Sequence, residues 1–171
     1  YAYDIATGKT ACLTENFPYP IWDEDQDVPM QRMPYGDMGW TENDGAFLIY
    51  DRHDIWQLDP KGEVAPVCIT AEEGRKTNRR FKYIKTDAEK RFVANGDEIL
   101  LNVFDYTNKE NGFATLKIGK AAAPQIKLID KYKFNRVNKA KNETEIIKEL
   151  ESYDNLTDKE FKLEIINRLK E

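Results

Sequence analysis

Residues 55–62, Ile-Trp-Gln-Leu-Asp-Pro-Lys-Gly, lead to Val67-Cys68-Ile69-Thr70, and this stretch has a counterpart near the start of the chain. There, Tyr3-Asp4-Ile5-Ala6-Thr7-Gly8-Lys9 leads to Cys12-Leu13-Thr14. Each unit is an apolar strand, a turn with Gly and Lys, and a second strand that ends in an aliphatic residue and Thr. Cys12 and Cys68 fall at matching places, 56 residues apart, so the pattern predicts an internal repeat.

A second pair of segments supports this repeat. Residues 46–51, Ala-Phe-Leu-Ile-Tyr-Asp, match residues 99–105, Ile-Leu-Leu-Asn-Val-Phe-Asp, with Asp51 and Asp105 separated by 54 residues. A fainter third unit runs from Phe113 to Ile118 and on to 126–129. A period of about 50 residues that holds four short strands is typical of a β-propeller blade.

The strand-like runs between these landmarks are separated by turn signals at 43–45, 59–62 and 95–97. We expect strands at 46–50, 53–58, 64–69, 81–84, 98–104, 113–118 and 126–134. The sequence therefore predicts that residues 1–140 are mostly β and form a partial β-propeller of about two to three four-stranded antiparallel blades.

The composition changes after about residue 140. Asn142-Glu-Thr-Glu145 and Thr157-Asp-Lys-Glu160 fit the capping-box pattern of helix starts, and apolar residues follow each at helical spacing. We expect a C-terminal α-helical hairpin over 141–171. Because an unclosed propeller exposes strand edges, we expect this hairpin to cover the open face or edge, or a second copy to do so by self-association.

Charge and hydropathy exclude several classes of partner. The chain of 171 residues has a net charge of −5, whereas a domain that binds duplex nucleic acid normally carries a basic excess. No apolar run approaches the roughly 20 residues of a membrane span. The first residues lack the basic and apolar regions of a signal peptide and no Met precedes them, so we expect the chain to be part of a longer protein.

The residues that usually carry catalysis are scarce. The chain has one histidine, His53, and one serine, Ser152, and the serine lies within a helical pattern rather than on a sharp glycine-flanked turn. Cys12 and Cys68 sit singly in apolar runs, so zinc binding is disfavoured and both are expected to be small buried hydrophobes rather than a disulfide. We expect no enzyme activity and no cofactor.

Several longer motifs resemble one family. These are Tyr19-Pro-Ile-Trp-Asp-Glu-Asp-Gln-Asp-Val-Pro29 with Pro34-Tyr-Gly-Asp-Met-Gly-Trp-Thr41, Tyr50-Asp-Arg-His-Asp-Ile-Trp-Gln-Leu-Asp-Pro60, and Gly74-Arg-Lys-Thr-Asn78 leading into 81–84. Over roughly residues 1–142 the chain resembles the N-terminal propeller of bacterial prolyl oligopeptidase and dipeptidyl peptidase family serine peptidases, closest to large exported members of Bacteroides-like bacteria.

The resemblance implies a substrate-gating propeller whose parent protein is periplasmic or extracellular. In that family the catalytic Ser, Asp and His lie in an α/β-hydrolase domain, and no G-x-S-x-G motif occurs in this chain, so those residues map onto nothing here. The paired glutamates that bind substrate amino termini are not matched convincingly, because Glu72-Glu73 lacks the surrounding pattern and is expected to lie in a loop. From about residue 142 the chain departs from the family.

The candidate sites are few. Asp23, Asp25 and Asp27 have the spacing that begins a calcium loop, but the sixth and twelfth positions, which need Gly and Glu, are Val28 and Pro34. A solvated acidic loop is favoured over an improvised calcium site. The basic run at 74–80 is expected to be a solvated loop. As a surface for interaction we select Trp22, Tyr35, Trp40 and His53.

Three functions stay open at this stage. The first is a non-catalytic propeller module that acts as a scaffold or binds a protein or peptide. The second is the inert, gating part of a serine peptidase whose hydrolase domain is absent from this chain. The third is a carbohydrate- or calcium-binding module that uses the aromatic and acidic loop at 17–40.

Overall fold

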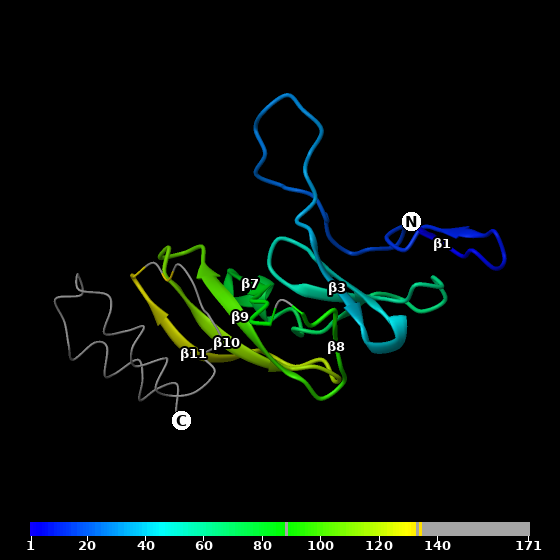
Figure 1. Ribbon diagram of the computed structural model, residues 1–171. Helices are drawn as coiled ribbons and strands as arrows, with labels where there is room; N and C mark the ends of the chain where they lie inside the picture. Colours follow the sequence, from blue (N-terminus) through cyan, green and yellow to red (C-terminus); the bar gives the residue numbers. More distant parts are fainter. Residues whose placement is uncertain (88, 133, 135–171) are drawn as a thin grey trace. The chain divides into compact units, whose positions relative to one another are not determined.

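The structure, a computed structural model, describes residues 1–87, 89–132 and 134. The chain divides into two units, Tyr1–Lys133 and Phe134–Glu171, and the described residues belong almost wholly to the first. They are mostly β, as the sequence predicts (Figure 1). The helical hairpin predicted at 141–171 lies outside the described residues. In the part that is described, no helix is long and apolar enough to cross a membrane.

Each of the seven predicted strand runs overlaps a strand of the structure. The strands are β1 (Ala2–Tyr3), β2 (Thr10–Ala11), β3 (Asp37–Thr41), β4 (Phe47–Tyr50), β5 (Ile55–Leu58), β6 (Val67–Cys68), β7 (Arg79–Tyr83), β8 (Phe92–Val93), β9 (Glu98–Asp105), β10 (Asn111–Lys117) and β11 (Gln125–Asp130). A short 3-10 helix, η1, spans Glu42–Asp44, and one helical turn, α1, spans Glu73–Thr77.

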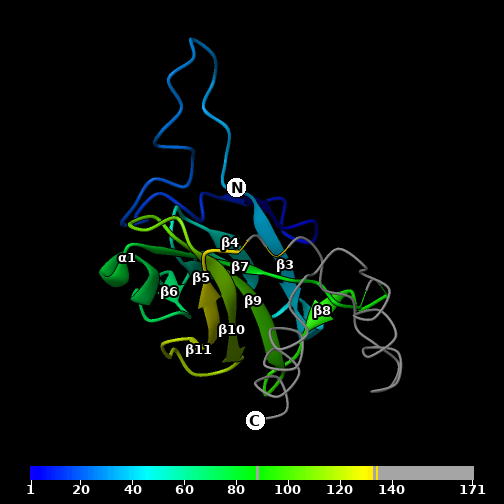
Figure 2. The same ribbon diagram turned by 90° about the vertical axis from the view of Figure 1, so that its left-hand side faces the viewer.

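The strands form three sheets, none of them closed (Figure 2). In sheet 1, strands β3, β4, β5 and β6 follow one another as an antiparallel meander, and the short β8 pairs in parallel with β3. In sheet 2, β7, β9, β10 and β11 form a second antiparallel meander of four strands. The N-terminal hairpin consists of β1 and β2. The two larger sheets therefore share a four-stranded antiparallel meander, to which sheet 1 adds β8 at its edge.

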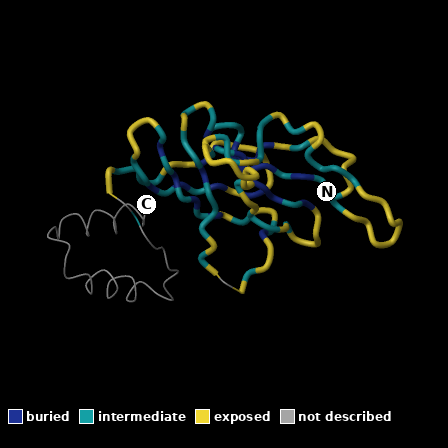
Figure 3. Tube along the Cα trace, turned by 90° about the horizontal axis from the view of Figure 1, so that it is seen from above, coloured by how far each residue is buried: buried dark blue, intermediate teal, exposed yellow. Residues whose placement is uncertain are grey.

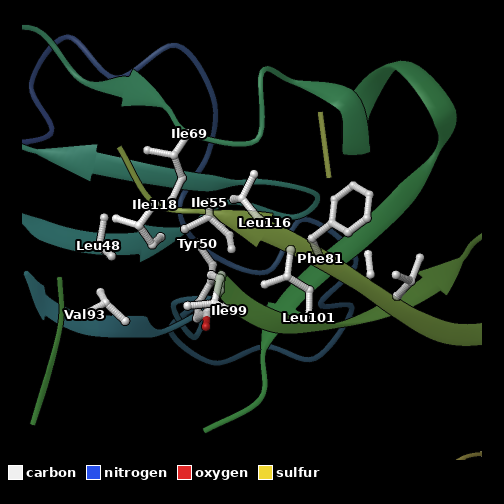
Figure 4. Close-up of a cluster of buried hydrophobic side chains, with 12 residues drawn as sticks. Leu48, Tyr50, Ile55, Ile69, Phe81, Val93, Ile99, Leu101, Leu116 and Ile118 are labelled. Atoms are coloured by element: carbon white, nitrogen blue, oxygen red, sulfur yellow. The ribbon is translucent and has the colours of Figure 1, made fainter. Parts of the chain in front are cut away.

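The main core lies between sheets 1 and 2 (Figure 4). Strand β9 shows why, because its residues are alternately buried and half-buried, and Leu101 and Val103 are fully buried. Burying one such aliphatic side chain stabilises the fold by about 1.5–3 kcal/mol. The buried residues of this core are Leu48, Tyr50, Ile55, Ile69, Phe81, Val93, Ile99, Leu101, Val103, Ala114, Leu116 and Ile118.

A second core covers the other face of sheet 1. Successive side chains of a strand point to opposite faces, so Trp56 points away from the main core that holds its neighbour Ile55. The Trp56 ring meets the rings of Phe17 and Tyr19 edge-on, with centroids 4.8 and 5.9 Å apart. Sheet 1 is thus apolar on both faces and packs against chain segments on both sides, while exposed residues collect in the connections (Figure 3).

Both sheets have a turn in which a repeated aspartate, Asp51 or Asp105, accepts backbone N–H groups. Asp51 follows β4, and its buried carboxylate accepts the backbone N–H groups of His53 and Asp54 at 2.8 and 2.6 Å. Asp105 ends β9 and accepts the N–H of Thr107 at 2.9 Å. Each carboxylate also binds an arginine. The repeated aspartates of the sequence therefore make similar hydrogen bonds at the corresponding strand end of each sheet, although the two turns differ in length.

Candidate interaction site

A concave surface lies between the N-terminal hairpin and sheet 1. We call it the aromatic pocket; its volume is about 840 Å³, and its apolar wall consists of Tyr1, Tyr3, Leu13, Trp40, Phe47 and Pro60. Trp40 and Phe47 are paired across β3 and β4, so their rings lie on the same face of sheet 1, with centroids 4.9 Å apart. Trp40 remains 40% exposed and Tyr3 65% exposed, so aromatic surface is accessible to a ligand.

The hairpin that forms one wall of the pocket is held by its turn. The Asp4 carboxylate accepts the N–H groups of Ala6 at 2.8 Å and Thr7 at 3.1 Å, and the hydrogen bond from Thr7 is the main cause that lowers the pKa of Asp4. Gly8 follows with a φ of 69°, a backbone conformation that glycine adopts readily. The tight turn keeps β1 and β2 paired beside the pocket.

The charged groups around the aromatic pocket balance. Lys9 and Lys61 contribute two cations, and Asp4 and Glu63 contribute two anions. Among the lining residues of the pocket there is no serine, cysteine or histidine. Its aromatic wall and balanced rim suit a ligand that is largely apolar and carries no large net charge.

A buried polar network lies behind the turn between β4 and β5. The Asp54 carboxylate is 1% exposed and accepts hydrogen bonds from the Thr70 hydroxyl at 2.6 Å and from the N–H groups of Gly74 and Arg75, both at 2.9 Å. Burial raises the pKa of Asp54, while these hydrogen bonds oppose the shift. The network fixes the segment 70–75 against sheet 1, which is a structural role.

The basic run at 74–80 belongs to this network. Arg75 donates to the Asp51 carboxylate at 2.9 Å and stacks on the Tyr19 ring, 3.7 Å from its centroid, and Arg79 donates to Asp105 at 2.9 Å. The prediction of a solvated loop is therefore wrong for Arg75 and Arg79, because the buried aspartates of both sheets need cationic partners.

The acidic pair beside this run also has local partners. Glu72 accepts a hydrogen bond from the Tyr19 hydroxyl at 2.8 Å, and Glu73 begins α1 rather than lying in a loop. The hydrogen bond to Glu72 is the largest cause that raises the pKa of the Tyr19 hydroxyl. Glu72 thus connects the N-terminal segment to the segment that precedes α1.

The structure places the four residues predicted for an interaction surface in different surroundings. Trp40 lines the aromatic pocket, and Trp22 is 44% exposed at the base of the loop 22–34. The half-buried Tyr35 follows that loop, and its hydroxyl accepts the N–H of Glu24 at 2.9 Å. His53 is only 7% exposed, and its Nδ1 hydrogen-bonds to the Arg79 carbonyl at 2.8 Å.

The three aspartates of the possible calcium loop are not gathered around a common point. Asp23 accepts the N–H of Asp25 at 3.0 Å, and the Asp25 carboxylate pairs with Arg52 at 2.8 Å. In the described part of the chain, no group of three His, Cys, Asp or Glu side chains is arranged to hold a metal ion.

The two cysteines are free thiols. Cys68 is buried, with its Sγ 3.3 Å from the Thr70 hydroxyl, and Cys12 is half-buried. Burial raises the pKa of Cys68 to about 11, so this thiol stays protonated at neutral pH and is a poor nucleophile.

Sequence reasoning missed most of the aromatic pocket. The sequence predicts a strand at Phe47 and a repeat unit at Tyr3, but no binding role for either residue. The available signal was the alternation in β4, which puts Phe47 on the opposite face from Leu48. The contribution of Tyr3 depends on the packing of the N-terminal hairpin beside sheet 1, which no local pattern encodes.

Comparisons with models of known protein families, with curated proteins and with solved structures found no match for this chain.

Proposed function

We propose that residues 1–133 are a non-catalytic stack of propeller-type blades that acts as a protein-interaction module. One observation carries this proposal: strands β3 to β6 of sheet 1 and the four strands of sheet 2 are antiparallel meanders that pack face to face, with the short β8 added in parallel at the edge of sheet 1. Blades of a propeller are such meanders, and each buries both faces only against its neighbours. The N-terminal hairpin, with the segment that packs on the far face of sheet 1, corresponds to part of a third blade.

The family assignment and the location are part of the same proposal. The motifs at 19–41, 50–60 and 74–84 support kinship with the propellers of prolyl oligopeptidase-family serine peptidases and an origin outside the cytoplasm. In such a protein the module would restrict access to a hydrolase domain. The interaction module and the gating domain make the same demand on this chain: in both roles it binds a polypeptide and does not cleave one.

We propose the aromatic pocket as the place where the polypeptide binds. An extended peptide can place apolar side chains against Trp40 and Phe47, and β1 pairs only with β2 among the described strands, which leaves backbone groups free for a further strand. The balanced charges of the rim favour a segment without a large net charge. The pocket therefore suits extended, apolar-rich segments of an unfolded or flexible chain.

A peptide array tests this function with a defined probe. The 171-residue protein is applied to overlapping peptides that cover β-casein, an unfolded protein rich in proline and apolar residues, and the peptides retained are titrated in solution. We expect a subset rich in aliphatic and aromatic residues to bind, and Trp40→Ala to weaken that binding by about tenfold or more. Trp22→Ala is the matched control, because it removes an equally exposed indole outside the pocket.

Two results would overturn the proposal. One is that no peptide binds more tightly than about 1 mM, or that binding is the same in Trp40→Ala and in the original protein. The other is enzymatic release of p-nitroaniline from Gly-Pro-p-nitroanilide by the purified chain, since we expect none above the rate without protein.

A further inference from the structure

The loop 22–34 projects away from the sheets and is closed at its base (Figures 1 and 2). Trp22 and Pro34 form an isolated antiparallel bridge, and the N–H of Asp23 donates to the Met33 carbonyl at 2.7 Å. The N–H of Tyr35 donates to the Ile21 carbonyl at 3.0 Å. The two limbs of the loop are thus joined like the start of a hairpin.

The side chain of Gln26 joins the limbs farther out. Its amide nitrogen donates to the carbonyls of Met30 and Gln31 at 3.1 and 3.3 Å, and its amide oxygen accepts the N–H of Met33 at 3.0 Å. The Asp25–Arg52 ion pair at 2.8 Å then ties the loop to the turn after β4. A loop held by these contacts is preorganised, so it loses little conformational entropy when it binds.

This ordered loop exposes apolar side chains. Val28 is 51% exposed, Met30 62% and Met33 60%. These apolar side chains are therefore in contact with water. Single exposed apolar residues are ordinary, but several on one ordered projection mark an interaction surface. Methionine side chains are flexible and polarisable, so they adapt to another apolar surface.

The charges at the tip of the loop are self-complementary. Of the other carboxylates in the loop, Asp23 and Glu24 are half-buried at its base and Asp25 is paired with Arg52, so the exposed charges that remain at the tip are the anion Asp27 and the cation Arg32. Among the described residues neither takes part in an ion pair. A second copy of the loop, related by a two-fold axis, can place its Arg32 against Asp27 and its Asp27 against Arg32.

We propose that the loop 22–34 is a self-association surface whose partner is the same loop of a second copy of this chain. The exposed Val28, Met30 and Met33 form the apolar centre, and two reciprocal Asp27–Arg32 ion pairs set the alignment. Two such loops bury less than the roughly 1,200 Å² of a standard interface, so the association is weak and reversible. This inference is independent of peptide binding in the aromatic pocket.

A charge exchange followed by sedimentation velocity tests the pairing. Between about 10 µM and 1 mM we expect the original chain to show a concentration-dependent monomer–dimer equilibrium. Arg32→Asp and Asp27→Arg each turn both ion pairs into repulsive contacts, so each is expected to weaken the dimer by about tenfold or more. The double variant Asp27→Arg/Arg32→Asp restores opposite charges and is expected to dimerise within about threefold of the original chain.

Met30→Ser tests the apolar centre and is expected to weaken the dimer without loss of folding, because the side chain is mostly exposed. A chain that stays monomeric up to about 1 mM overturns the proposal. So does a dimer that all four variants leave unchanged, since it would form through strand edges instead. A double variant that dimerises no better than the single variants overturns the reciprocal ion pairs.

Discussion

Replacement of Asp51 by alanine tests the aspartate-stabilised turn that occurs in both sheets. The carboxylate is 1% exposed and accepts three hydrogen bonds: from the N–H of His53 at 2.8 Å, from the N–H of Asp54 at 2.6 Å and from Arg75 at 2.9 Å. Alanine leaves two buried N–H groups without their acceptor. Each such group costs about 1–3 kcal/mol.

The ion pair adds less than these two N–H groups. The Arg75 side chain is 28% exposed, so water replaces much of what it loses, and the pair contributes about 1 kcal/mol or less. The expected loss is therefore about 2–7 kcal/mol, against a total stability of about 5–15 kcal/mol for a domain. Urea denaturation, monitored by tryptophan fluorescence, measures this loss. If the unfolding free energy falls by about 2 kcal/mol per M urea, the urea midpoint is expected to fall by about 2 M.

Asp59→Ala provides the matched control. Asp59 also accepts three N–H groups, those of Lys61, Glu63 and Val64 at 3.1, 2.9 and 3.1 Å, but these bonds lie in an exposed turn. Water can replace the lost acceptor there, so we expect a loss of about 1 kcal/mol or less. The reasoning is refuted if Asp51→Ala loses no more stability than Asp59→Ala, because burial would then have no effect on the cost.

Three further predictions concern the core and its titratable groups. Phe81→Ala removes a ring that is 1% exposed, and the cavity should lower the unfolding free energy by about 3–5 kcal/mol in the same urea assay. Gly74→Ala would place a Cβ 2.6 Å from the His53 carbonyl oxygen, so we expect a loss of about 1–3 kcal/mol. Burial raises the pKa of Cys68 from 9.0 to about 11 and that of Tyr50 from 10.0 to about 12, so the contribution of these two groups to the unfolding free energy should be constant between neutral pH and about pH 9 and fall as the pH rises toward 12.

The unfolding free energy falls with rising pH because burial favours the neutral, protonated forms of Cys68 and Tyr50. Both groups bind their protons more tightly in the folded state, so their contribution is complete below the unfolded pKa and is lost as the pH passes the folded pKa. In Cys68→Ala the decline between about pH 9 and 11 should be shallower. A profile that is flat up to pH 12, or identical in the variant, contradicts this account. For Gly74→Ala and Phe81→Ala, unchanged urea midpoints would show that the contacts around these residues relax at no cost.

Local sequence patterns determined the strands because strand formation depends on the alternation of neighbouring residues. The alternation in 98–105 puts Leu101 and Val103 on one face, and the turn residues at 59–62 and 95–97 separate the strands. The repeat of Asp51 and Asp105 also came from the sequence alone, and the two residues make similar hydrogen bonds in their turns. Such features follow from residues that are near one another along the chain.

Only the tertiary structure decided which surfaces are covered. His53 and Arg75 look like surface residues in the sequence, but sheet packing puts His53 beside the Arg79 carbonyl and Arg75 against Asp51. The aromatic pocket needs Tyr3 and Phe47, which are far apart along the chain, to line the same concave surface. Hydrophobic burial has no direction, so a sequence shows which faces are apolar, whereas the packing of one sheet on another decides which of them remain open to a partner.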